Sequence, residues 1–129
     1  MSHYNWNVLI VEDEYDSIQV MTRVLTYHGA TVYVARNGRE CLRILKDFTP
    51  SVILMDLDMP IMDGWETLAQ IRANPATNHL PVVAITAYHS ANVAEDATRA
   101  GFNDYFPKPV SIRSIMPRLE QIVPRQMSQ

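Results

Sequence analysis

Five side chains capable of polar chemistry stand at or just after the ends of short apolar segments: Glu12, Asp13, Asp56, Thr86 and Lys108. Carboxylates that lie close together repel one another and raise one another's pKa, and a divalent cation relieves that repulsion. An oxygen-only ligand set with an open side suits Mg²⁺ (or Mn²⁺), which keeps several waters and commonly bridges to a phosphate. A lysine and a hydroxyl add donors for phosphoryl oxygens, and a carboxylate can act as a nucleophile. Brought together, these residues would suit phosphoryl transfer.

Short β-branched apolar runs alternate along the chain with segments of helical spacing. The runs are Val8–Val11, Thr31–Ala35, Val52–Met55, Pro81–Thr86 and, more weakly, Tyr105–Phe106. Strict alternation predicts a parallel sheet with helices on both faces. The fold class expected at this length is a flavodoxin-like, doubly wound (βα)5 α/β fold with strand order 2-1-3-4-5. The run Thr31–Ala35 is the most mixed in polarity, which is typical of an edge strand.

The predicted topology brings the five polar residues to one place. In doubly wound sheets, ligands bind beyond the C-terminal ends of the strands, at the point where the strand order reverses. Here that point lies between the first and third strands. Taken singly, each residue has an ordinary structural interpretation, such as a solvated loop, a helix cap or a surface lysine. Their common position at one sheet edge favours a functional site.

Two of the predicted helices have unusual compositions. The fourth, over Val93–Ala100, is rich in alanine and buries little area, so it can change position at low cost. The last, marked by Ile115–Ile122, contains Pro117. A proline in a helix interior costs roughly 3 kcal/mol, whereas in the first turn it removes no intrahelical bond. We therefore expect the regular helix to start near Ser114, as its N-cap.

Length and charge limit the possible functions. The chain has 129 residues, which allows one domain, and we expect a single unit over residues 1–129 with a core of about residues 6–123 and short tails. The net charge of −3 argues against nucleic acids and anionic membranes as partners. Cys41 is the single cysteine, which excludes a disulfide framework. The N-terminus lacks the basic and apolar regions of a signal peptide, so we expect a cytoplasmic location.

Four stretches of the chain carry motifs in a fixed order. They are residues 8–14 (VLIVEDE), residues 52–60 (VILMDLDMP) followed by Asp63 and Gly64, residues 84–87 (AITA) and residues 104–109 (DYFPKP). With these motifs the chain resembles the receiver domain of two-component response regulators over essentially its whole length.

The resemblance implies a role for each polar residue. Asp56 is the phosphoacceptor, and Mg²⁺ is held by Glu12, Asp13, Asp56 and the backbone carbonyl of Asp58. Lys108 contacts the phosphoryl group, and its bond to Pro109 is cis. Thr86 is the switch hydroxyl and Tyr105 the switch aromatic, while Asp58 and Tyr88 flank the attacking water and tune dephosphorylation. One mild departure is Glu12, which stands where Asp is commoner in the family.

The resemblance also implies a phosphorylation-dependent signalling switch, not an enzyme acting on an external substrate. A sensor histidine kinase or a histidine phosphotransfer protein supplies the phosphoryl group. The surface of the fourth helix, fifth strand and fifth helix then changes and controls a downstream protein. Few residues follow the last helix, so we expect a stand-alone receiver, either chemotaxis-regulator-like or part of a phosphorelay. We expect it to be a monomer or a phosphorylation-dependent dimer; a receiver excised from a longer protein is the alternative.

Parts of the sequence also fit three other functions. Asp56-Leu57-Asp58 resembles the Asp-x-Asp motif of haloacid-dehalogenase-type phosphatases, but Pro60 stands where those enzymes favour Thr or Val. A flavin or nucleotide carrier needs a Gly/Ser/Thr-rich loop after the first strand, where this chain has three acids. A receiver that works without phosphorylation, as an interaction module, is the third alternative.

Overall fold

The computed structural model describes residues 4–87 and 90–124, which contain one five-stranded parallel sheet. The order of elements is β1 (Asn7–Val11), α1 (Tyr15–Tyr27), β2 (Thr31–Ala35), α2 (Gly38–Leu45), β3 (Val52–Asp56), α3 (Gly64–Ala73), β4 (Val82–Thr86), α4 (Ala91–Ala100), β5 (Asp104–Pro107) and α5 (Ile112–Ile122). The strands lie in the order β2-β1-β3-β4-β5, so the predicted flavodoxin-like fold and the predicted place of β2 at an edge are confirmed.

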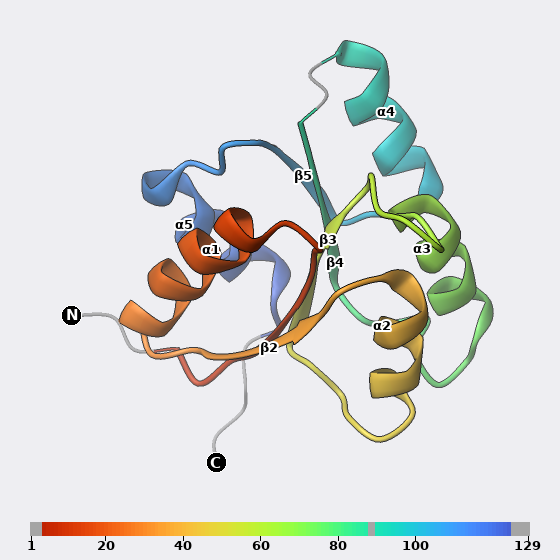
Figure 1. Cartoon of the computed structure of the whole chain (residues 1–129), viewed down its shortest axis with the longest axis horizontal. Coiled ribbons are helices and arrows are strands. Elements are labelled where there is room, and N and C mark those ends of the chain that lie inside the picture. The colour runs from red at the N-terminus through yellow and green to blue at the C-terminus, as the bar shows by residue number, and fades with distance from the viewer. Residues whose placement is uncertain (1–3, 88–89, 125–129) are drawn as a thin grey trace.

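Helices cover both faces of the sheet: α1 and α5 lie on one face, and α2, α3 and α4 on the other (Figure 1). Alternate residues of β1 divide between the faces, because successive side chains of a strand point in opposite directions. Val8 and Ile10 pack in the hydrophobic cluster under α1 and α5. Leu9 and Val11 pack in the cluster under the other three helices. Burial on both faces explains why the central strands are apolar throughout.

Local sequence signals set most helix ends. The side chains of Asn37 and Asp63 accept hydrogen bonds from backbone N–H groups in the first turns of α2 and α3. Gly101 ends α4 with a φ of +112°, a left-handed conformation that glycine adopts without steric cost. The longest helix in the described chain, α1, has 13 residues, and none of the described helices is long and apolar enough to cross a bilayer.

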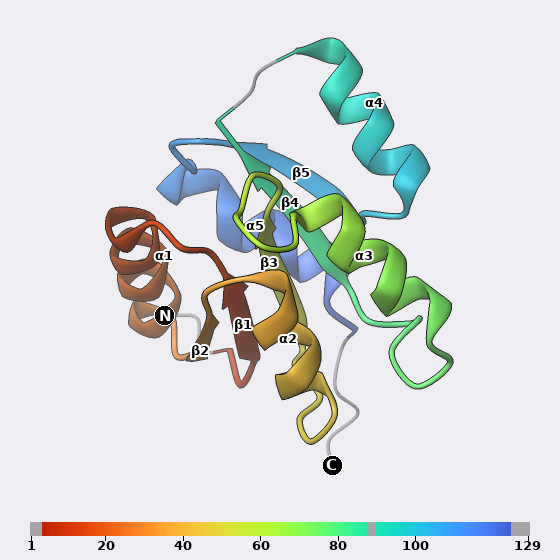
Figure 2. The same ribbon diagram turned by 45° about the vertical axis from the view of Figure 1, so that its right-hand side comes forward.

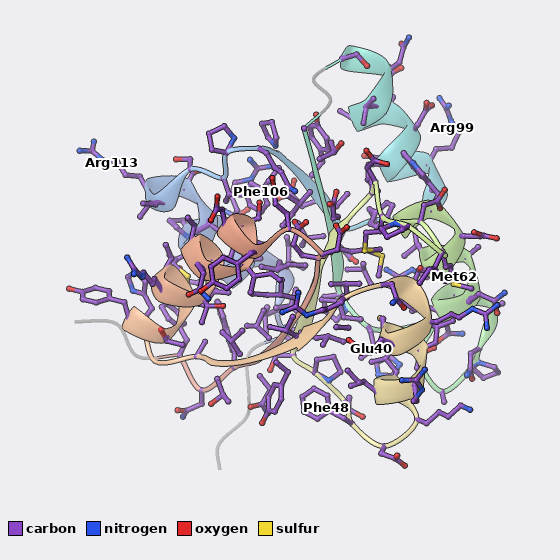
Figure 3. All side chains as sticks on the ribbon, in the orientation of Figure 1. Glu40, Phe48, Met62, Arg99, Phe106 and Arg113 are labelled. Carbon is purple, nitrogen blue, oxygen red and sulfur yellow. The ribbon has the colours of Figure 1, made fainter. Side chains whose placement is uncertain are left out.

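The expected start of α5 near Ser114 is wrong. The helix begins at Ile112, with Ser111 as N-cap, and Pro117 lies inside it. The proline ring is exposed and removes only the N–H that would reach the carbonyl of Arg113, a residue at the exposed helix start (Figure 3). Water can satisfy that carbonyl, so the local cost is small against the buried apolar face of the helix. Tertiary packing therefore overrides the proline signal.

Candidate functional site

The C-terminal ends of two central strands place Glu12 and Asp56 side by side. β1 and β3 pair in parallel with Val11 opposite Met55, so the next residue of each strand reaches the same level of the sheet edge. Both carboxylates are buried, with Glu12 1% and Asp56 5% exposed. The N–H of Glu12 also donates to the carbonyl of Ala35 at 2.9 Å, which continues the pairing of β1 with β2.

An open hollow of about 430 Å³ lies over this sheet edge, lined by Glu12, Asp13, Glu14, Asp56, Asp58, Ala87 and Lys108. One carboxylate oxygen from each of Glu12, Asp13 and Asp56 lies within 4.8 Å of the others. Asp13 is exposed, so the cluster opens to solvent on its side. The structure thus brings together the three predicted carboxylate ligands of the metal and the predicted lysine.

Lys108 reaches into the acidic cluster from the end of β5. Its Nζ lies 2.8 Å from Glu12 Oε1, 3.3 Å from Asp56 Oδ2 and 3.4 Å from Glu14 Oε1. Its backbone N–H donates to the carbonyl of Thr86 at 2.8 Å, which fixes the residue against the end of β4. The peptide bond from Lys108 to Pro109 is cis, as the family resemblance implied.

Burial and close charges perturb the titration of two groups in the hollow. The pKa of the Glu12 carboxyl is raised from an ordinary 4.5 to about 7: burial is the largest cause and the nearby Asp56 carboxylate adds to the rise, whereas Lys108 and the N–H of Glu14 act against it. Burial acts to lower the pKa of Lys108, but its contacts with Glu12 and Asp56 outweigh that effect, so the pKa is raised. Lys108 is therefore a permanent cation, and Glu12 holds a proton more tightly than an ordinary carboxylate.

Glu14 is a member of the site that the sequence reasoning did not single out. The Ser17 hydroxyl donates to its Oε1 at 2.6 Å, and Lys108 contacts the same oxygen. The serine hydrogen bond and then the lysine charge hold the pKa of Glu14 below its usual range. The sequence feature that could have identified Glu14 as a site residue is its position two residues after Glu12, in the same acidic run.

The donor set fits a hard divalent cation. Glu12 Oε1 is buried; among the described residues no donor meets it with hydrogen-bond geometry, and its close contact is the ion pair with Lys108 Nζ at 2.8 Å. A buried oxygen of this kind, beside two further carboxylates, suits an ion such as Mg²⁺. The Asp58 N–H donates to Asp56 Oδ1 at 3.1 Å, which orients that carboxylate. The carbonyl of Asp58 as a further ligand stays a prediction.

The predicted switch residues occupy β4 and β5. Thr86 ends β4 and is buried, with 1% of its surface exposed. Tyr105 pairs opposite Ala84 in β5, is half-buried, and packs against the hydrophobic cluster on the α2–α3–α4 side. Tyr88 lies outside the described residues. The roles of these residues remain predictions.

The loop between β3 and α3 turns sharply beneath the site. The N–H of Met62 donates to the carbonyl of Pro60 at 2.8 Å, across Ile61, whose φ is +74°. A three-residue turn of this hand is strained for a β-branched residue. Gly64 then approaches the end of β3 so closely that a Cβ would lie 2.5 Å from the carbonyl oxygen of Asp56. A side chain at this position would push on the backbone that carries the Asp56 carboxylate.

Comparison with known proteins decides the family. The model of the response regulator receiver domain matches residues 8–120. The chain belongs to the response regulator receiver domain family. Receiver domains of two-component systems are generally non-enzymatic signalling switches, and in general they interact with histidine kinases and downstream effectors.

Two curated relatives differ in length. An uncharacterized 14.6 kDa protein of Leptolyngbya boryana is 36% identical to this receiver domain over 115 residues, which are 89% of this chain and 88% of that protein. Response regulator MprA of Mycolicibacterium vanbaalenii is 30% identical over 118 residues, which are 92% of this chain and 50% of MprA. The chain thus spans nearly all of one relative and half of the other.

A solved receiver domain supports the assignment of the metal. The receiver domain of sensor histidine kinase PA1611 from Pseudomonas aeruginosa is 28% identical, with a TM-score of 0.84, and the match covers 92% of this chain and 98% of that one. That structure has a magnesium ion coordinated in its active-site cleft. Binding of Mg²⁺ in the active site is a feature of the family, and the acidic cluster of this chain has the matching chemistry.

Proposed function

We propose that this receiver domain is a phosphorylation switch that accepts a phosphoryl group on Asp56 from phosphohistidine. The observation that carries the proposal is the environment of the Asp56 carboxylate. One oxygen accepts the Asp58 N–H, and the other lies 3.3 Å from Lys108 Nζ. The carboxylate borders an open hollow through which a donor can approach. A fixed, reachable carboxylate beside a cation suits nucleophilic attack on phosphorus.

The residues around Asp56 have different roles in the phosphoryl transfer. Glu12, Asp13, Asp56 and the Asp58 carbonyl would hold Mg²⁺, which when bound supplies charge neutralisation for the phosphoryl oxygens. An Asp56 oxygen forms the new bond to phosphorus while the bond to the donor's imidazole nitrogen breaks. Lys108 then exchanges carboxylate contacts for contact with a phosphoryl oxygen, which keeps its charge compensated.

The conformational change begins because the phosphoryl group on Asp56 lies near the ends of β4 and β5, where Thr86 and Lys108 stand. The Thr86 hydroxyl hydrogen-bonds the phosphoryl oxygen, and Tyr105 moves into the space this opens. The surface of α4, β5 and α5 changes as a population shift between two states. Asp58 and Tyr88 tune the lifetime of the acyl phosphate through their positions beside the attacking water.

The cellular setting follows from the family and the charge of the chain. The phosphoryl donor is a sensor histidine kinase or a histidine phosphotransfer protein, and the output is a downstream protein in the cytoplasm. The net charge of −3 disfavours direct binding to nucleic acid or to a membrane surface. The domain works as a monomer or as a phosphorylation-dependent dimer.

The proposal is tested by the intact mass of the protein after incubation with Mg²⁺ and acetyl phosphate. We expect one phosphoryl adduct that decays on standing. The adduct should be missing without metal and in the variant Asp56→Asn, which keeps the size of the side chain. Asp63→Asn, in the N-cap of α3 outside the hollow, is a matched control that should still be modified. A stable adduct on Asp56→Asn would overturn the assignment of the acceptor.

A further inference from the structure

The helix α4 is held very differently at its two ends. Ala97 is the one fully buried side chain among those described in it, and Val93 and Ala94 are half-buried. Figure 1 and Figure 2 both show its N-terminal end standing away from the other elements and its C-terminal end returning to α3. The side chain of Ser90 caps the first turn with one hydrogen bond to a backbone N–H. Among the described side chains of the N-terminal half, Val93 packs against the hydrophobic cluster under α4 but none is fully buried, so little packing holds this half in place.

Arg72 of α3 secures the other end. Its Nε and Nη2 donate to the carbonyl of Gly101 at 3.2 and 2.9 Å, and Nη2 also reaches Asn103 Oδ1 at 3.0 Å. Its Nη1 donates to the carbonyls of Leu80 at 2.7 Å and Asn78 at 3.1 Å. The guanidinium makes no ion pair with a described carboxylate, so its whole donor set is used on uncharged oxygens.

This network joins the C-terminal end of α4 to three other elements, at the sheet edge opposite the hollow. Asn103 Oδ1 also accepts the N–H of Val82, which begins β4. Phe102, directly after the end of α4, is buried and packs edge-to-face on Trp65, with ring centroids 5.7 Å apart. The positive guanidinium also lies where the carbonyls at the end of α4 carry partial negative charge. The C-terminal end of α4 is thereby fixed to α3, β4 and β5.

We infer that Arg72 is a positioning residue that fixes the C-terminal end of α4, so that α4 moves by swinging its N-terminal end. The swinging end is the one that follows Thr86 and the site, and the fixed end lies about 15 Å away along a 10-residue helix. A small displacement beside the site becomes a rotation of the whole helical face about Gly101. The anchor itself is independent of phosphorylation; only the force that drives the swing rests on the proposed function.

Residue-resolved amide hydrogen exchange on the full chain tests the anchor. In the unmodified protein we expect the amide of Phe102 to be protected at least about tenfold better than those of Glu95 and Asp96. In Arg72→Met the protection of Phe102 should fall by roughly 10- to 100-fold, the range expected for losing hydrogen bonds to a charged group. That loss should exceed any loss at Leu54 in the central strand, which reports global destabilisation. Arg72→Lys should restore part of it.

The matched control is Arg99→Met. Arg99 lies near the same end of α4, but its side chain is 75% exposed, and among the described residues its one ion pair is with Asp96. The substitution Arg99→Met removes one positive charge from this end of α4 but leaves the hydrogen bonds of Arg72 intact. The protection of the Phe102 amide should therefore stay unchanged. Equal protection at both ends of α4, or equal losses at Phe102 and Leu54 in Arg72→Met, would overturn the inference.

An NMR experiment on the modified protein tests this inference separately from the proposed function. After modification with acetyl phosphate and Mg²⁺, NMR shifts should change at Glu95 and Asp96 and stay near their unmodified values at Gly101 and Phe102. Equal changes at both ends would refute a fixed anchor. If no adduct forms, the proposed function fails, while the exchange data on the unmodified protein still decide the anchor.

Discussion

Replacing Glu12 by Gln should change how the stability of the metal-free protein depends on pH. The pKa of Glu12 is about 7 in the folded protein against an ordinary 4.5. Between those values the folded protein holds a proton that the unfolded chain has released. The free energy of unfolding therefore falls as pH rises from about 4.5 to about 7, because raised carboxyl pKa values favour folding only below the folded-state pKa.

The size of this effect follows from the two pKa values. At about 1.4 kcal/mol per pKa unit, the difference corresponds to roughly 3 to 4 kcal/mol, a large share of the 5–15 kcal/mol that stabilises a typical domain. Saturating Mg²⁺ should abolish the fall, because the cation binds the ionised carboxylate of the folded state and adds its own binding free energy to stability.

Urea unfolding followed by circular dichroism, at about pH 5 and about pH 8 with EDTA, measures the effect. Wild type should lose stability between the two conditions, and Glu12→Gln should lose much less. Glu14→Gln is the matched control at the same edge: Glu14 is exposed and its pKa is lowered, so its stabilising contribution is lost at acid pH and not above neutrality. Equal stability changes in wild type and Glu12→Gln would refute the assigned titration.

Three further substitutions test individual contacts. Ile61→Gly should stabilise the protein by about 1 kcal/mol in urea unfolding, because glycine relieves the strained positive φ; a loss of stability would refute strain at this turn. Gly64→Ala should destabilise it by about 2 kcal/mol in the same assay, because the new Cβ meets the backbone of Asp56; an unchanged midpoint would contradict that close approach. Lys108→Ala should bind Mg²⁺ more tightly in calorimetry, because the lysine ammonium 2.8 Å from Glu12 competes with the metal in wild type; weaker Mg²⁺ binding would contradict that competition. The NMR shift changes that acetyl phosphate causes in α4 should disappear in this variant.

Most of the fold could be predicted because the informative signals are local. Continuous apolar runs mark β1, β3 and β4, and a glycine at positive φ ends α4 where the sequence places it. The start of α5 could not be predicted, because Pro117 is a local helix breaker and the packing that overrides it comes from residues far along the chain.

The site was predictable for a different reason. Parallel strands deliver their C-terminal residues to one edge, so strand order alone brings Glu12, Asp56 and Lys108 together. The anchor at Arg72 had no such signal. It depends mainly on backbone carbonyl groups up to 29 residues away, and every residue type has a backbone carbonyl, so no sequence pattern marks them.

The central claim is that Asp56 carries the phosphoryl group, and the most direct measurement is chemical mapping of the modified residue. Treatment with borohydride after acetyl phosphate and Mg²⁺ reduces an aspartyl phosphate to homoserine, which peptide mass spectrometry locates. The account predicts homoserine at position 56 alone. Homoserine at Asp13 or Asp58 in place of Asp56 would contradict it.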